Sequence, residues 1–236
     1  MSDQRDSFSP LSLLRQQSWL SPAFPTGSYS YSHAIEWAVE AGDIHDRESL
    51  VDWLDVDLRC GSGRNEAIFF MEAMRCTIKA DCEKLLKVAE LAAAFRGTAE
   101  FALESSQQAA SCLVTLRRVW PDPFVETLSE LLSEFKISPT LSVVLGVRTA
   151  RQDIPAALAL PAFLQSYLAN LITAGVRLVP LGQTDGQLGI AELESAVVAV
   201  AAQAEEATIH DLGSAGFLID LASASHETQY TRLFRS

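Results

Sequence analysis

Histidine and cysteine are the residue types that would do chemistry most directly, as metal ligands, proton carriers or nucleophiles. The four histidines form no HxxxH or HExxH pattern, and the four cysteines form no CxxC pair; they are His33, His45, His210, His226, Cys60, Cys76, Cys82 and Cys112. The chain also contains no GxSxG nucleophile turn and no GxxxxGK[ST] phosphate loop. We therefore expect no catalytic residue, no metal site and no resident cofactor in this chain, which is not predicted to be an enzyme.

The cysteine spacing is typical of reduced, mostly buried thiols in a cytosolic protein. Cys76 and Cys82 are six residues apart, which makes a metal pair a minor alternative. His226 and Glu227 can offer ligands to a metal shared with a partner, although solvated polar residues explain them equally well. The first ten residues lack the apolar core of a signal peptide, so we expect a cytoplasmic protein.

The last eleven residues, HETQYTRLFRS, have the composition of a binding element. Aromatic and arginine side chains are enriched at binding hot spots because each combines a large contact area with a directional polar group. One helical turn would place Tyr230 and Phe234 on the same side. The segment either binds a partner or docks on its own domain; the partner-binding candidates are His226, Glu227, Gln229, Tyr230, Arg232, Leu233, Phe234 and Arg235.

A second candidate segment, PTGSYSYSHAIE at residues 25–36, combines a chain break with hydroxyls that can begin a helix. Tyr29 and Tyr31 are two residues apart, so one is expected to pack inward and the other to be available for contact. The segment is either a structural turn or a partner or dimer surface. Its candidate contact residues are Pro25, Thr26, Gly27, Tyr29, Ser32 and Glu36.

The third candidate segment is RLVPLGQTDGQ at residues 177–187. Asp185 and Gly186 form a turn dipeptide, and neutral amides of the kind that flank it suit an interface better than catalysis. Arg177 can anchor a buried ion pair or bind a partner carboxylate. The candidate contact residues here are Arg177, Pro180, Gly182, Gln183, Gly186 and Gln187.

The elements that must position these segments are helical throughout. Apolar residues repeat at intervals of three and four within 47–60, 85–95, 164–172 and 193–204, and sustained period-two alternation is absent. Ser9-Pro10, Asp46 and Ser138-Pro139 are the expected helix starts. We predict an all-α protein of roughly eight to ten helices, with one domain at 1–225 and an exposed interaction tail at 226–236.

Bulk composition agrees with a folded, acidic protein. Apolar residues make up 48% of the chain, charged residues 20%, and the formal net charge is −12. Nucleic acid and anionic membranes are therefore excluded as ligands on electrostatic grounds, whereas a basic protein surface fits. Residues 154–176 carry no charge, but Pro155, Pro161, Gln165 and Asn170 favour a buried helix over a membrane span.

The three segments, in this order and spacing, resemble the signatures of the UreF family of urease accessory proteins. The resemblance implies an all-helical, dimeric, non-catalytic protein that binds UreD (UreH in some organisms) and with it recruits the GTPase UreG. The assembly then delivers nickel to urease apoprotein in a GTP-dependent step, with nickel handled by the complex rather than held by this chain. By resemblance, residues 226–236 engage UreD, and the helical body forms the dimer and the UreG-facing surface.

One departure from the family lies in the first segment. Family members commonly have Gly where this chain has Ala34, and since alanine costs nothing in a helix we expect an unchanged fold there. The alternative function from the residues alone is an all-α enzyme or small-ligand carrier with an unrecognised pocket.

Overall fold

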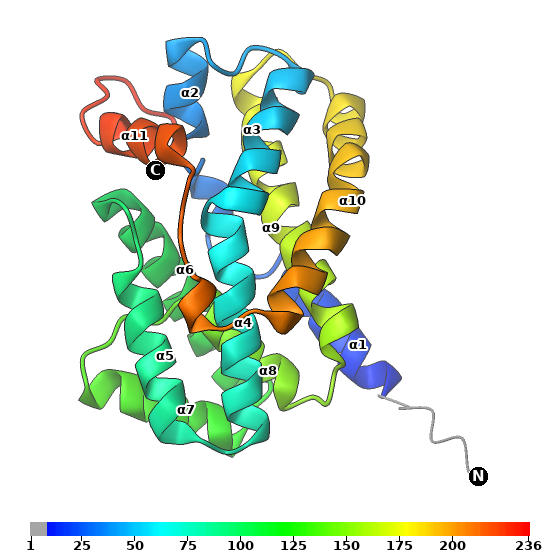
Figure 1. The fold of residues 1–236 in the computed structure, drawn as a ribbon, viewed down its shortest axis with the longest axis vertical. Helices are drawn as coiled ribbons and strands as arrows, with labels where there is room; N and C mark the ends of the chain where they lie inside the picture. Colours follow the sequence, from blue (N-terminus) through cyan, green and yellow to red (C-terminus); the bar gives the residue numbers. More distant parts are fainter. Residues whose placement is uncertain (1–8) are drawn as a thin grey trace.

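A computed structural model describes residues 9–236, which form a single all-α domain (Figure 1). Within these residues there are eleven α-helices and two short 3₁₀ helices, close to the predicted number, and no strand. In chain order they are α1 (Pro10–Leu20), η1 (Ser28–Ser30), α2 (Ile35–Ala41), α3 (Arg47–Cys60), α4 (Ser62–Ile78), α5 (Cys82–Ala94), α6 (Ala99–Val119), α7 (Pro123–Glu134), α8 (Leu141–Ala150), α9 (Ala156–Leu178), α10 (Gln183–Glu206), η2 (Ile209–Asp211) and α11 (Phe217–His226).

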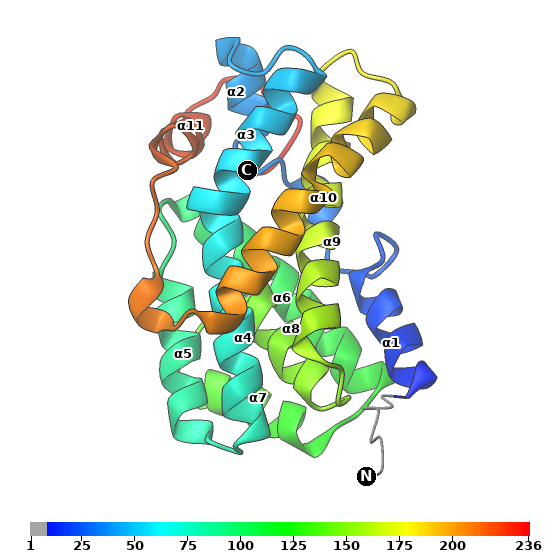
Figure 2. The same cartoon turned by 45° about the vertical axis from the view of Figure 1, so that its right-hand side comes forward.

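Helix α4 lies at the centre of the domain, and nearly all of its side chains are buried. It contacts α3, α5, α8, α9 and α10, and α10 crosses α3, α4 and α9 diagonally (Figure 2). Helices α5 and α7 lie at the lower end of the molecule in Figure 1, while α2 and α11 lie at the upper end. The four lysines lie at the end of α4, in the first half of α5 and just after α7, and these parts of the chain are at the lower end of the molecule in Figure 1.

Local signals account for most helix starts. Ser9 and Asp46 cap α1 and α3 as predicted, through Ser9 Oγ to the Leu11 amide at 3.2 Å and Asp46 Oδ1 to the Ser49 amide at 2.9 Å. The start predicted at Ser138-Pro139 is wrong, because α8 begins at Leu141 after an extended Thr140.

The long uncharged segment forms α9, a core helix as predicted. It is the one helix within residues 9–236 that has the length and hydropathy of a membrane span. Its buried side chains face α3, α4 and α10, and Pro161, the sixth residue of the helix, removes one backbone hydrogen bond without ending it. We therefore read its hydrophobicity as the requirement of a helix packed inside a bundle.

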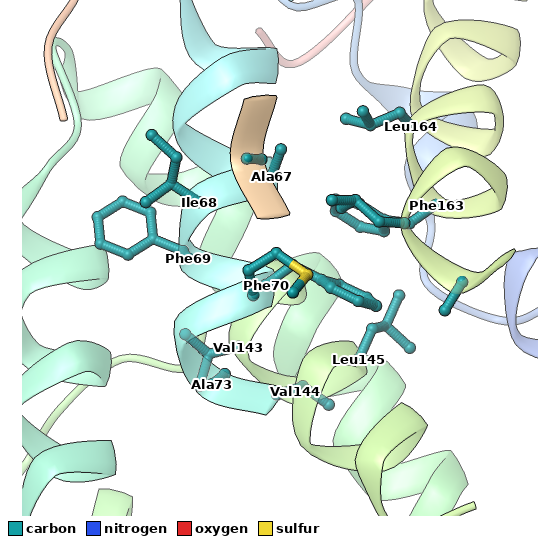
Figure 3. Packing of buried hydrophobic residues seen from close by; sticks show 14 of the residues in the cluster. Ala67, Ile68, Phe69, Phe70, Ala73, Val143, Val144, Leu145, Phe163 and Leu164 are labelled. Carbon is teal, nitrogen blue, oxygen red and sulfur yellow. The ribbon is translucent and has the colours of Figure 1, made fainter. Parts of the chain in front are cut away.

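Two core helices approach each other closely where α8 crosses α4. Gly146 of α8 faces the backbone of Phe70, and a Cβ atom at position 146 would lie only 2.4 Å from the Phe70 carbonyl oxygen. Around this crossing, Ala73, Val143 and Leu145 fill the space between the two helices (Figure 3). The absence of a side chain at 146 thus sets the distance between α4 and α8.

We predict that Gly146→Ala destabilises the protein by about 1–3 kcal/mol, since the added methyl group must push apart two helices that are fixed by the rest of the core. Urea unfolding followed by circular dichroism measures the loss. The matched control is Gly213→Ala, where an added Cβ meets nothing within 4 Å. Equal stability of the two variants would contradict the close approach.

Candidate interaction site

The last residues fold back over α2, and the Glu36 carboxylate holds them there. Glu36 lies in the first turn of α2 and is buried. The backbone N–H of Leu233 donates to Glu36 Oε1 at 2.6 Å, and the N–H of Phe234 donates to Oε2 at 2.8 Å. Hydrogen bonds to an ionised carboxylate are stronger than neutral ones, so this side chain fixes two consecutive peptide groups of the tail.

His226, the last residue of α11, is completely buried between two glutamates. Its Nε2 lies 3.1 Å from Glu36 Oε2, and its Nδ1 lies 2.7 Å from Glu100 Oε2. Arg232 then donates from Nη1 to Glu100 Oε1 at 2.7 Å. Glu36 and Glu100 therefore connect α2 and α6 to both α11 and the tail.

Backbone contacts join the tail to the first sequence segment. The Arg235 N–H donates to the Ser30 carbonyl at 2.8 Å, and the Ser32 N–H donates to the Ser236 backbone oxygen at 2.7 Å. Ser236 Oγ donates to Glu104 Oε2 of α6 at 2.8 Å. Residues 30–32 and 235–236 thus lie side by side although they are about 200 positions apart in sequence.

Arg177 links the third segment to the other two. Its Nη1 donates to the Tyr29 carbonyl at 2.8 Å, and its guanidinium lies 4.3 Å from the centre of the Phe234 ring. A cation placed over an aromatic face within about 6 Å is attracted to it. The three segments identified from the sequence therefore meet at Arg177.

The tail is not a helical turn, so the prediction that Tyr230 and Phe234 share one side is wrong. Phe234 is buried, whereas Tyr230 is fully exposed. The amides of residues 233 and 234 bond to Glu36 instead of to earlier carbonyls, which leaves the segment irregular.

The tail is also only partly exposed, contrary to the prediction of an exposed tail. His226, Gln229 and Phe234 are buried against the chain's own helices, whereas Tyr230 and Leu233 remain in solvent together with Glu227, Arg232 and Arg235. Of the two open alternatives, self-docking thus describes the inward residues, and the outward ones remain available to a partner.

As predicted, one of the two tyrosines at positions 29 and 31 packs inward and the other is exposed. Tyr31 is buried and its hydroxyl donates to Gln107, while Tyr29 is exposed. Ser32 Oγ accepts from the Glu36 N–H at 3.3 Å, so this hydroxyl satisfies an amide in the first turn of α2, although the residue at the N-cap position is Ala34. Gly27, in a left-handed conformation with φ 77°, supplies the chain break after Pro25 and Thr26.

The remaining residues of the third segment do not join this site. Asp185 and Gly186 are in the first turn of α10, not in a turn between elements, and Asp185 Oδ2 caps the helix by accepting from the Gly182 N–H at 2.9 Å. Gly186 packs against Val176. The exposed members of the segment lie at the α9–α10 end of the molecule; they are Pro180, Gly182, Gln183 and Gln187.

A second buried polar network lies beneath the tail. His33 Nδ1 is 3.2 Å from Glu104 Oε2, its Nε2 is 3.2 Å from the Tyr167 hydroxyl, and that hydroxyl donates to Asp57 Oδ2 at 2.6 Å. The His33 ring stacks on Phe101 with centroids 4.1 Å apart. Burial and the Asp57 carboxylate raise the pKa of Tyr167 well above its usual value, so the hydroxyl stays protonated and donates.

Sequence reasoning missed the α6 glutamates. Glu100, Glu104 and Gln108 repeat at intervals of four and are all buried, which forms a polar stripe on the inner face of α6. The four-residue spacing of these side chains is evident in the sequence. A row of polar side chains on one helix face usually indicates the solvent-exposed face, however, and only the positions of α2 and α11 show that this row is buried.

The chain also departs from expectation at Ala34. It is the residue before α2, with φ 68°, and follows His33 at φ 54°. The expectation that alanine costs nothing there is wrong, because a left-handed backbone is strained for any residue with a Cβ atom. Glycine, which the resemblance associates with this position, has no such strain.

Within residues 9–236, no group of three or more His, Cys, Asp or Glu side chains is arranged to hold a metal ion. Cys76 is buried and Cys82 half-buried, and both are free thiols. Among these residues the site is thus built from carboxylates that bind backbone amides, histidines and arginines.

Fold and site together define an all-helical protein whose C-terminal segment is folded against residues 30–36 and helix α6 and leaves several of its side chains exposed. A family model described as UreF matches residues 44–194. The chain is 47% identical over 225 residues to the urease accessory protein UreF of Rhodopseudomonas palustris strain BisB5, covering 95% of this chain and 91% of that protein. It is 47% identical over 224 residues to that of Bradyrhizobium diazoefficiens, with 95% and 91% covered, and 44% identical over 227 residues to that of Xanthobacter autotrophicus, with 96% and 92% covered. The chain belongs to the UreF family of urease accessory proteins.

We predict that Glu36→Gln loosens the tail, because an amide replaces one of the two accepting oxygens and removes the charge. Loss of hydrogen bonds to a charged group costs about 1.5–3 kcal/mol, so cleavage by trypsin after Arg232 should become about 10- to 100-fold faster. Limited proteolysis with mass spectrometry measures this rate. Glu48→Gln, at an exposed position of α3, should leave it unchanged; unaltered protection in the Glu36 variant would refute the carboxylate's role.

The His33 network should make stability depend on pH. Burial alone lowers the pKa of His33, but the charge and hydrogen bond of Glu104, aided by Asp57, raise it more, and the net shift from 6.5 is upward. Charged His33 therefore stabilises the fold fully below about pH 6.5, and this contribution disappears as the pH rises through the folded-state pKa.

Accordingly, His33→Gln should lower the free energy of unfolding more at about pH 6 than at about pH 9. Urea titrations at the two pH values measure the difference, in which any pH-independent cost of the substitution cancels. His45→Gln is the control, because the His45 side chain is 69% exposed. An equal loss at both pH values would rule out a stabilising charged His33.

Proposed function

We propose that this protein acts in urease maturation as a non-catalytic scaffold, binding UreD (UreH) and with it the GTPase UreG and urease apoprotein. In this proposal nickel is cargo of the assembled complex, inserted in a GTP-dependent step, and the chain has no resident cofactor. Membership of the UreF family supports the accessory role, and the relatives are named urease accessory proteins.

The observation that carries the proposal is a concentration of exposed apolar side chains in the last twenty residues. Side chains that are each more than half exposed line one stretch of α11 and the tail: Phe217, Leu218, Leu221, Tyr230 and Leu233. Large apolar side chains exposed in such number over a short stretch are expected where another protein covers them. In our proposal the UreD-binding surface includes α11 as well as the tail.

The docked conformation favours binding by the outward residues. Because Glu36, Glu100 and Arg177 already hold the tail, Tyr230 and Leu233 project from a backbone that a partner need not order first. Rigid presentation lowers the entropy cost of association.

We also propose a homodimer in the cytoplasm. Leu11 and Leu14 of α1, which are both more than half exposed, provide apolar surface for self-association, as does Leu158 of α9. Free thiols at all four cysteines are compatible with a reducing compartment.

A small-ligand carrier is the second candidate, because a pocket between α1, α4, α6, α8 and α9 is lined by polar and apolar side chains, including His33, Glu104 and Tyr167. Tight binding of a small molecule by the isolated chain would favour it over the scaffold.

We predict that the tail separates into binding and stability residues. Tyr230→Ala and Leu233→Ala should weaken UreD binding, with a loss of about 2–4 kcal/mol or roughly 30- to 1,000-fold for a tyrosine at a hot spot, and should leave the melting temperature nearly unchanged. Phe234→Ala should lower the melting temperature, since it removes a buried ring.

Co-purification with UreD and thermal unfolding of each variant provide the two readouts, and deletion of residues 230–236 should affect both. A truncated protein that binds UreD as tightly as the full chain would show that the tail is only structural. A lower melting temperature of the Tyr230 variant would show that this side chain stabilises the fold and does not act in partner binding.

A further inference from the structure

A groove separate from the docked tail lies between α3 and the start of α11, at the upper end of the molecule where both helices appear in Figure 2. Its volume is about 440 Å³, which is within the range of ligand-binding pockets. Its walls come from Ser49, Asp52, Trp53 and Val56 on one side and from residues 215–219 on the other, with Asp43 at one end.

The rim of this groove is apolar and open to solvent. Val56 is 47% exposed, Leu218 67% and Phe217 76%. These side chains continue into the exposed face of α11, so the groove extends the apolar surface that the proposed function assigns to a partner. Apolar side chains left in water next to a concave surface are expected where another protein inserts its own.

The charge of the groove specifies what that protein must carry. Asp43 and Asp52 are exposed and line the groove, and within residues 9–236 no Lys, Arg or His side chain lines it with them. Residues 178–231, which include the whole α11 wall, contain no Lys or Arg. The groove therefore attracts cationic side chains and repels anionic ones.

We propose that this groove binds a basic, apolar segment of a partner protein. A lysine or arginine of that segment lies between Asp43 and Asp52, and its apolar neighbours pack on Val56, Phe217 and Leu218. The inference rests on the proposed function. It adds to the partner-binding tail a second contact region, the groove, which is acidic and apolar.

The test compares a groove variant with a control of equal charge. The double variant Asp43→Lys/Asp52→Lys reverses the charge of the groove. The control, Glu130→Lys/Glu134→Lys, makes the same change in net charge at exposed positions of α7, at the opposite end of the molecule. The affinities of purified UreD and, separately, of purified UreG for each protein are measured at about 0.15 M salt. We expect the groove variant to lose about 10-fold or more in affinity for one of the two proteins, and the control to change by less than about 3-fold.

A further variant, Val56→Ser, removes apolar contact without changing the charge and should weaken binding of the same protein, and melting temperatures of all variants establish that they are folded. Equal affinities for the groove and control variants would overturn the inference while leaving the proposed function intact. If the unmodified chain binds neither UreD nor UreG, both fail. If the groove variant changes only the solution mass of this chain, a second copy occupies the groove and the proposal is wrong.

Discussion

The arrangement at the upper end of the molecule depends on one carboxylate, that of Glu36. Both of its oxygens accept backbone N–H groups of the tail, and one of them also meets His226. A buried carboxylate is tolerated only when hydrogen bonds replace its lost hydration. The tail amides and His226 provide these bonds, so the charge and the tail require one another, and α11 is fixed as a consequence.

Two strained residues bring Glu36 to this position. His33 and Ala34 both have a positive φ, which turns the chain sharply between the tail-binding Ser32 and the start of α2. The strain persists because the surroundings determine both residues: His33 is held by Glu104 and Phe101, and Ala34 is completely buried.

Sequence patterns predicted the helices because their causes are local. The capping of α3 by Asp46 and the apolar periodicity of α5 and α9 operate within a few residues of the chain. The three candidate segments could likewise be selected by composition and resemblance. Their meeting at Arg177 could not be derived, because it requires the distances between segments that are far apart in sequence.

The same limit explains the errors at the site. Tyr230 and Phe234 have a helical spacing, but an acceptor on a distant helix removed the hydrogen bonds that a helix needs. Gly186 and Asp185 form a common turn pair, yet the two residues also suit a helix start where the glycine packs closely on Val176 and the aspartate caps. In each case tertiary contacts decided between two locally acceptable conformations.

The distribution of lysine has a practical consequence. Amine-reactive chemistry on side chains is confined to residues 79–136, because no lysine occurs outside that range. Coupling the protein to a sensor surface through its lysines would therefore attach it by the end that bears α5 and α7 and orient α11 and the tail toward the solution. A layer prepared in this way presents the acidic, apolar end uniformly, without an engineered attachment point.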